Sequence, residues 1–283
     1  MRRMHRRIVI AVLSIAVALS AAGRDRPIVL ETANHTKMRA YNVGITAFFA
    51  VFSAMRQGQI KSWRDVPRHL LIGGGAGAAF YEAKRMAGNG RRTAGWLIAN
   101  ATATVLENTA SGEHPIGRIG YTIGPMRFRV ATPYVRTGVA KIDADFSIAE
   151  AFFLAYARYE GDSISFRNGL VTVDRDTPWK DGDDVFTGRT FGIFPGVVPG
   201  AAPVTWSHEI VHAIQFQQVD AVEPPQWTFG HDVPPGETRP LLWLRHIRPG
   251  YTHLLNLTHD RRNYQDRWYE VEAHWLAEER PVP

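Results

Sequence analysis

The chain has 283 residues, of which 45% are hydrophobic and 21% are charged, with a formal net charge of +6. This balance excludes both a disordered chain and a polytopic transporter, and the length fits one large domain or two small ones. Cysteine is absent, which excludes disulfides, thiolate metal sites, a cysteine nucleophile and a lipoprotein anchor. No stripe of Arg and Lys with interleaved aromatics indicates a nucleic-acid partner.

Residues 1–23 are predicted to be a targeting segment. Several arginines precede an apolar run at residues 8–22, and the run ends in small residues. This order is typical of a bacterial secretory signal peptide, and an uncleaved N-terminal anchor is the alternative. We therefore expect an exported, periplasmic or membrane-associated protein.

Residues 24–116 are predicted to form an apolar helical subdomain. Hydrophobic residues recur at helical spacing in three stretches, residues 40–57, 69–82 and 93–106. Gly73 and Gly77 give the second stretch a small-x-x-x-small face, which allows another helix backbone to approach closely. The sequence leaves open whether this subdomain packs on the rest of the chain or lies against a membrane.

From about Gly117 the hydrophobic period changes to the alternation that is typical of β-strands. Strands are predicted at residues 119–123, 126–130, 140–146, 163–166, 170–173 and 186–194. A helix is predicted at residues 147–159, and the dipeptide Asn168–Gly169 predicts a tight hairpin turn. Thr190–Phe194 is the candidate edge strand for an extended substrate, because it lies close in sequence to the helix that follows.

The stretch Trp206–Gln215 carries the strongest chemical signal in the chain. It reads His-Glu-x-x-His, with imidazoles at His208 and His212 and a carboxylate at Glu209. Positions four apart project from the same side of a helix, so the two imidazoles can share one zinc ion. Glu209 can then act as general base on a zinc-bound water.

The residues around this motif strengthen its interpretation as a helix. Ile210 and Ile214 lie on the side opposite the two imidazoles, which leaves room for a metal between this helix and the next element. Residues 196–203 are rich in Gly and Pro and are expected to be non-helical, with Thr205 or Ser207 as the N-cap.

The segment after this helix is expected to be irregular. Residues 219–240 contain two Pro-Pro pairs and several aromatics, which indicate a wall of a cleft. For His246, His253 and His259 a surface or packing role is expected, and metal ligation or transition-state donation is the alternative.

A catalytic zinc needs a third protein ligand, and residues 266–277 are predicted to supply it from a second helix. Glu270 and Glu272 lie about 200° apart around such a helix, so only one of them can face the metal. Glu270 aligns with Ala273 and Ala277, whose small side chains allow two helices to approach, and it is therefore the predicted ligand. Glu272 is the alternative and is expected on a solvated edge.

These two segments together resemble the gluzincins, the zincin metallopeptidases whose third ligand is Glu. The pattern Glu270-x-Glu272-Ala273 is similar to the Glu-x-Glu-Ala-Asp segment of integral-membrane zinc endopeptidases of the CAAX-processing and heat-shock type. The ending His212-Ala-Ile-Gln215 is similar to that of small bacterial zincin domains of uncharacterised role. The resemblance covers only these short segments.

The resemblance implies zinc ligation by His208, His212 and Glu270, with Glu209 as the base. The chain departs from the family at His274, which stands where the family usually has Asp, the residue that orients a ligand imidazole. His274 can take over that role, act as a fourth ligand, or face the substrate as an electrophile. This departure bears on activity more than on metal binding.

The sequence therefore predicts an α+β protein in which a zincin-like domain, residues 117–283, follows the helical subdomain. The expected function is that of a zinc-dependent hydrolase, a metallopeptidase acting on peptide or protein substrates. The alternative is an exported or membrane-associated interaction protein whose zinc is structural or vestigial.

Overall fold

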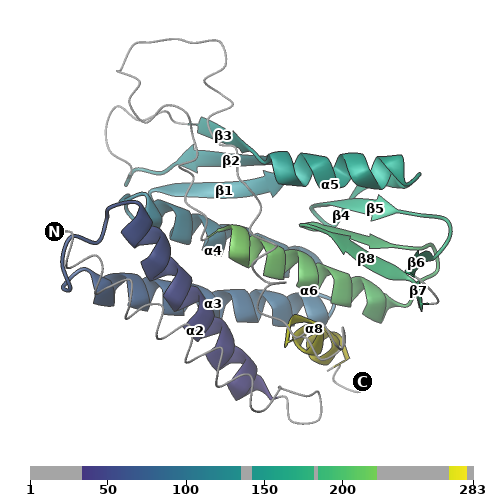
Figure 1. The fold of residues 1–283 in the computed structure, drawn as a ribbon, viewed down its shortest axis with the longest axis horizontal. Coiled ribbons are helices and arrows are strands. Elements are labelled where there is room, and N and C mark those ends of the chain that lie inside the picture. Colours follow the sequence, from purple (N-terminus) through teal and green to yellow (C-terminus); the bar gives the residue numbers. More distant parts are fainter. Residues whose placement is uncertain (1–33, 135–141, 182–183, 222–267, 279–283) are drawn as a thin grey trace.

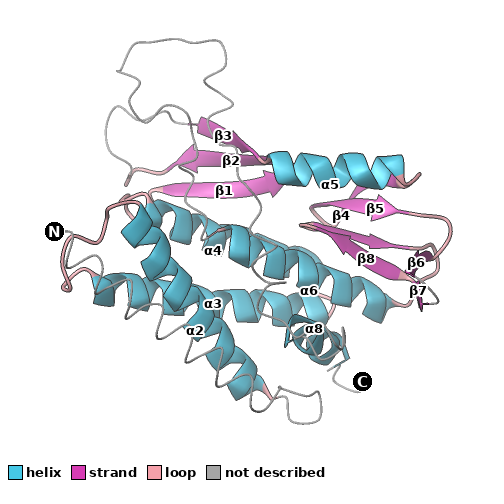
Figure 2. Ribbon diagram, viewed as in Figure 1, coloured by secondary structure: helices cyan, strands magenta, loops and turns pink. Residues whose placement is uncertain are grey.

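The computed structural model describes residues 34–134, 142–181, 184–221 and 268–278. The predicted targeting segment, most of residues 219–240 and His246, His253 and His259 lie outside the described residues. The described part is α+β, as predicted, and most of its helices gather on one side with the strands along the other (Figure 2).

The three predicted N-terminal helices are confirmed, and each is longer than predicted. They are α2 (His35–Arg56), α3 (Val66–Gly88) and α4 (Arg92–Ala110). The Asn34 side chain caps α2 by accepting a hydrogen bond from the Lys37 amide at 2.9 Å. None of the described helices combines the length and the apolar character needed to cross a bilayer.

The first sheet confirms two of the predicted strands and the described part of a third, whose first two residues lie outside the described residues. Its strands are β1 (Arg118–Ile123), β2 (Met126–Ala131) and β3 (Ile142–Phe146), in the order β1-β2-β3 with antiparallel pairing. Helix α5 (Ile148–Tyr159) follows, and the Ser147 hydroxyl caps it by accepting from the Glu150 amide at 3.2 Å.

The predicted hairpin around Asn168 is also confirmed. Strands β4 (Ser163–Arg167) and β5 (Leu170–Asp174) pair antiparallel. Asn168 and Gly169 both have positive φ angles, 54° and 83°. This is the backbone conformation that a two-residue type I′ turn requires and that Asn-Gly adopts readily.

The single strand predicted at residues 186–194 is wrong, because the chain turns twice there. The strands in this region are β6 (Trp179–Asp181), β7 (Asp184–Phe186), β8 (Gly188–Phe191) and β9 (Phe194–Val197). Gly192, with a φ of 61°, lies in the tight turn between β8 and β9. The second sheet has the order β4-β5-β9-β8, so β8 is an edge strand of the described sheet. Of the candidate edge strand Thr190–Phe194, only Thr190 and Phe191 therefore lie in the edge strand β8.

Helix α6 (Pro203–Asp220) contains the His-Glu-x-x-His motif and begins earlier than predicted. Its N-cap is Ala202, so the predicted caps Thr205 and Ser207 are wrong. Proline suits the first helical position because its missing amide would have no partner there. Helix α8 (Trp268–Glu278) provides the predicted second helix and contacts α6 (Figure 1).

Helix α6 is central to the packing of the described chain. It contacts α3, α4 and α8 as well as strands β8 and β9. One hydrophobic cluster includes Phe80 and Trp96 from the N-terminal helices together with Ile210, Ile214 and Val271 from α6 and α8. The residues on the two sides of the predicted boundary at 117 therefore share a core.

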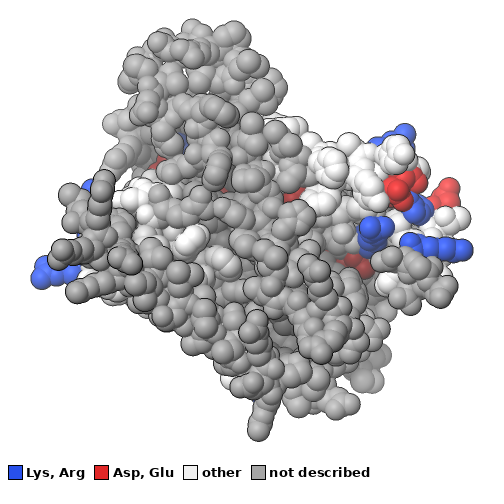
Figure 3. All heavy atoms as spheres, viewed as in Figure 1, with Lys and Arg blue, Asp and Glu red and all other residues white. Residues whose placement is uncertain are grey.

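Charged side chains of both signs are mixed at the end of the molecule that carries β4 to β7 (Figure 3). Two ion pairs there are Arg167 with Asp174 at 3.1 Å and Arg175 with Glu160 at 3.3 Å. On the face drawn, charged side chains at this end therefore lie at the surface and pair with one another.

Candidate metal centre

Three side chains from α6 and α8 meet at one point. The Nε2 atoms of His208 and His212 lie 2.9 Å apart. The Oε2 atom of Glu270 lies 3.2 Å from Nε2 of His212 and 3.4 Å from Nε2 of His208. All three ligand atoms lie within 4.8 Å of one another, and this is the only such group of His and acidic residues in the described part of the chain.

The spacing of these atoms suits a divalent cation. Zinc bonds of about 2.0–2.1 Å to nitrogen and oxygen in a tetrahedral site place neighbouring ligand atoms about 3.3 Å apart. The three separations, 2.9, 3.2 and 3.4 Å, are close to that edge length. Two imidazole nitrogens with one carboxylate oxygen also form a donor set that zinc favours.

Small residues allow α8 to approach closely enough for Glu270 to reach the imidazoles. Ala273 and Ala277 of α8 are buried. Gly88 at the end of α3 lies against the backbone of Leu276, where a Cβ atom would collide with the carbonyl group. Helix α8 can therefore pack against both α3 and α6 because small residues lie at the contacts.

Glu272 does not face the metal centre, and its predicted solvated position is wrong. The side chain has 0% exposure, and its Oε2 atom accepts a hydrogen bond from Lys84 Nζ at 2.6 Å. The helical spacing correctly separates Glu270 from Glu272. Helical spacing cannot show that the ammonium group of Lys84 is buried on the other side of the helix, next to Glu272.

Glu209 lies beside the three candidate ligands in a tightly enclosed space. The Thr190 hydroxyl of β8 donates to its Oε2 atom at 2.5 Å. A Cβ atom added at Gly188 would lie 2.6 Å from its Oε1 atom, so a larger residue at that position would force the carboxylate to move. Burial raises the pKa of Glu209 to about 7, although the positive charge of His212 and the Thr190 hydrogen bond oppose the shift.

The pKa of His212 is raised to about 9 in the metal-free protein. Burial, the largest single effect, would lower it, but the charge and hydrogen bond of Glu270 together with the smaller effects of Glu209 and Gln215 outweigh burial. A bound cation must displace this proton, because only the neutral imidazole can act as a ligand.

Two further side chains belong to the site. The His274 ring centroid lies 4.4 Å from that of His208, so His274 stands beside a candidate ligand, as its position one helical turn after Glu270 allows. Gln215 shares the imidazole face of α6 in the sequence, where no partner could be assigned to it. In the structure its Oε1 atom lies 2.8 Å from Nδ1 of His212.

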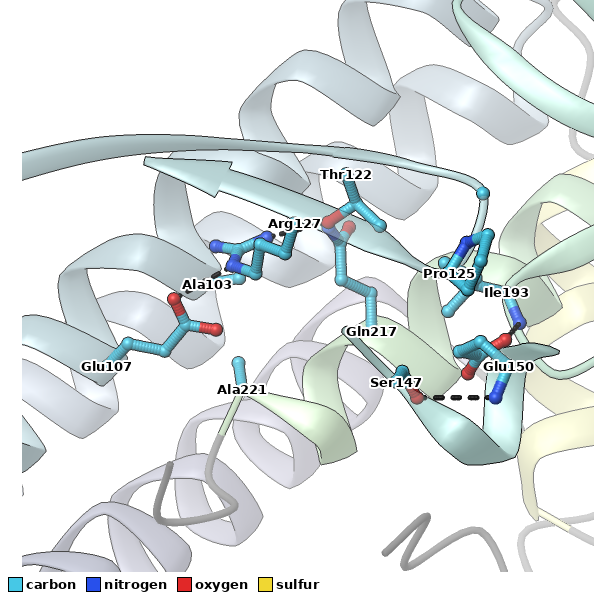
Figure 4. Close-up of a pocket in the computed structure, with 11 residues that line it drawn as sticks. Ala103, Glu107, Thr122, Pro125, Arg127, Ser147, Glu150, Ile193, Gln217 and Ala221 are labelled. Atoms are coloured by element: carbon cyan, nitrogen blue, oxygen red, sulfur yellow. Dashed lines mark hydrogen bonds and ion pairs between the residues drawn. The ribbon is translucent and has the colours of Figure 1, made fainter. Parts of the chain in front are cut away.

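A separate cavity of about 30 Å³ lies between α4, the β1–β2 hairpin, α5 and α6 (Figure 4). Polar residues that line it include Glu107, Thr122, Arg127, Glu150 and Gln217. Arg127 donates to Glu107 at 2.8 Å, and both side chains are buried. A space of this size holds about one water molecule, so it is not a substrate site.

Sequence reasoning gave no role to Lys84 or Asn42, which lie near this centre behind Glu272. The sequence carries no signal that marks Lys84, because Glu82 and Arg85 beside it in α3 are also charged. Comparisons of the chain with models of known protein families, with curated proteins and with solved structures found no match.

Proposed function

We propose that the chain is a zinc-dependent hydrolase that cleaves peptide bonds. The observation that carries the proposal is the convergence of two imidazole nitrogens and one carboxylate oxygen within 4.8 Å of one another. Three protein ligands with a further position left for water or substrate are the usual arrangement of catalytic zinc. Glu209, next to His208 in the chain, supplies the carboxylate that such a centre uses as a base.

Each residue at the candidate metal centre has a separate role in the proposed hydrolysis. His208, His212 and Glu270 would hold the zinc ion, which would supply a Lewis acid for a carbonyl group and for water. Glu209 takes up a proton at its carboxylate and passes it to the leaving amine. Thr190 fixes the position of that carboxylate through its 2.5 Å hydrogen bond.

An extended peptide is the substrate that fits the neighbouring strand. β8 is the edge strand of its described sheet, so its outer backbone groups are available to pair with a substrate strand. The contact between Thr190 and Glu209 brings a peptide paired with β8 next to the base. His274, beside His208, lies where it can donate a hydrogen bond to a carbonyl oxygen that becomes negative.

The test is the Glu209→Gln variant, with zinc content and peptidase activity measured beside the wild type. We expect one zinc in both proteins and a loss of turnover of about 100-fold or more in the variant, because the amide cannot accept the proton. Retained turnover in the zinc-loaded variant would remove Glu209 from the mechanism.

The same measurements separate the alternative function. His274 stands where the resembled gluzincins usually have Asp, and this favours a zinc that is structural or vestigial. The chain would then be an exported or membrane-associated interaction protein. That alternative predicts one bound zinc and no turnover of any peptide in a random library, by the wild type as well as the variant. Export itself stays a prediction from the first residues of the chain.

A further inference from the structure

A chain of buried polar side chains leads from His212 away from the metal centre. It crosses from α6 to α8 and then to α3 and α2, and none of its side chains is more than 5% exposed. Its members are Gln215, Glu272, Lys84, Asn42 and Gln218. Buried polar groups are costly unless they are paired, so this arrangement needs a physical reason.

The hydrogen bonds of Gln215 determine which way its amide points. Its Nε2 atom lies 3.0 Å from the carbonyl oxygen of Tyr269 and 2.8 Å from Oε2 of Glu272. Both partners are acceptors, so the NH₂ group must face them and the amide oxygen must face His212. That oxygen lies 2.8 Å from Nδ1 of His212, which therefore carries the proton. The other nitrogen, Nε2, is the one that faces Glu270.

Glu272 can hold Gln215 in this orientation because Lys84 balances its charge. Lys84 Nζ donates to Glu272 at 2.6 Å, to Asn42 Oδ1 at 2.6 Å and to Gln218 Oε1 at 3.1 Å. Asn42 in turn donates to the second oxygen of Glu272 at 2.5 Å. An isolated buried carboxylate or ammonium group would be strongly destabilising, so each of the two charges requires the other.

We propose that Gln215, Glu272 and Lys84 are positioning residues for the metal centre. They fix the Nδ1–H tautomer of His212, so that its Nε2 lone pair is directed at the cation. The N-terminal helices thereby take part in metal binding through Lys84. This inference rests on the proposed function, since it assumes that His212 is a zinc ligand.

The experiment measures zinc affinity by competition with a chelator of known affinity, using the full chain. We expect Gln215→Leu and Glu272→Gln each to weaken zinc binding about 10- to 100-fold, the range found when partners of ligand histidines are removed. The double variant Gln215→Leu/Glu272→Gln should bind zinc no more weakly than Gln215→Leu alone, because both changes act through one hydrogen bond to His212. The visible absorption spectrum of the Co²⁺-substituted protein should change in the same variants.

A matched control separates positioning from general stability. Glu107→Gln breaks another buried ion pair, with Arg127 at 2.8 Å, away from the metal centre. It should lower the melting temperature and leave both the zinc affinity and the Co²⁺ spectrum unchanged. Because Glu272→Gln leaves the Lys84 charge buried, Lys84→Met/Glu272→Gln is measured beside it and should show the same weakened zinc binding in a better-folded protein.

The outcomes distinguish this inference from the proposed function. A wild type that binds no zinc would overturn both together. A wild type that binds zinc, with Gln215→Leu and Glu272→Gln binding it equally tightly, would overturn the positioning role alone. A loss of zinc affinity in Glu107→Gln as large as that in Glu272→Gln would also overturn it, because the effect would then be one of stability.

Discussion

At the scale of single residues, the candidate base Glu209 is closely packed against strand β8. Glu209 is enclosed by Gly188 on one oxygen and by the Thr190 hydroxyl on the other. The methyl group of Thr205 also stands where a side chain at Gly188 would lie, at 2.7 Å. The position of the base therefore depends on the absence of a side chain at Gly188.

We predict that Gly188→Ala lowers turnover by about 100-fold. The new methyl group would displace the Glu209 carboxylate, and a displacement of about 1 Å is enough to cause a loss of that size. Zinc content should be unchanged, since the three atoms nearest to the added methyl group belong to Glu209 and Thr205 and not to a candidate ligand. Steady-state kinetics together with metal analysis of the purified variant check this outcome. Full turnover in Gly188→Ala would show that the carboxylate works from another position.

The candidate ligands could be predicted from the sequence because helical spacing is local. His208 and His212 lie one turn apart, and Glu270 is separated from Glu272 by the geometry of one helix. Lys84 could not be matched to Glu272 in this way. The two are 188 residues apart, and no local pattern shows which side chain of α3 faces α8. For the same reason Glu272 was wrongly expected in solvent.

At the scale of elements, the contact between α2 and α3 depends on glycine. A Cβ atom at Gly73 would lie 2.6 Å from Cβ of Ala50 and 2.7 Å from Cα of Ala47. Gly75, on the same helix, has no atom within 4 Å of the equivalent position. Gly73 therefore lies in the close contact with α2, whereas Gly75, also in α3, does not.

We predict that Gly73→Ala destabilises the protein by about 1–3 kcal/mol, the usual cost of overpacking. Gly75→Ala, the matched control, should stabilise it by about 0.5–1 kcal/mol through the helix propensity of alanine. Urea denaturation of both variants gives the two free energies of unfolding. Equal effects of the two substitutions would contradict the close approach of α2 and α3.

Elements with a strong internal pattern could be predicted, and those that depend on distant partners could not. The hairpin at Asn168–Gly169 follows from the turn residues alone. The break between β8 and β9 does not, because apolar residues stand on both sides of Gly192 and suggest one continuous strand. What fixes β9 is its parallel pairing with β5, where Val173 lies opposite Gly196.

At the scale of the whole molecule, protons and the cation compete for the same centre. The pKa of Glu209 is raised from 4.5 to about 7, and that of His212 from 6.5 to about 9, in the metal-free protein. The folded chain therefore holds more protons than the unfolded chain across this range. The stabilisation by protonated His212 is complete below about pH 6.5 and is lost as the pH rises through about 9.

We predict that zinc raises the melting temperature more at about pH 8 than at about pH 6. The metal-free protein loses stability as the pH rises, by a few kcal/mol, whereas zinc binds more tightly once His212 no longer has to lose a proton. Calorimetry with zinc and with a chelator at both pH values measures the two differences. A zinc effect that is equal at both pH values, or larger at the lower one, would contradict the raised pKa.

The position of α8 in the chain also determines when the site can exist during synthesis. Glu270 follows His212 by 58 residues. A growing polypeptide that has reached only α6 already contains both imidazoles and the base, but it lacks the carboxylate ligand. It also lacks Glu272, which accepts a hydrogen bond from Lys84 in the folded chain. A ribosome must therefore complete the last described helix before the nascent chain can capture a metal ion at this centre.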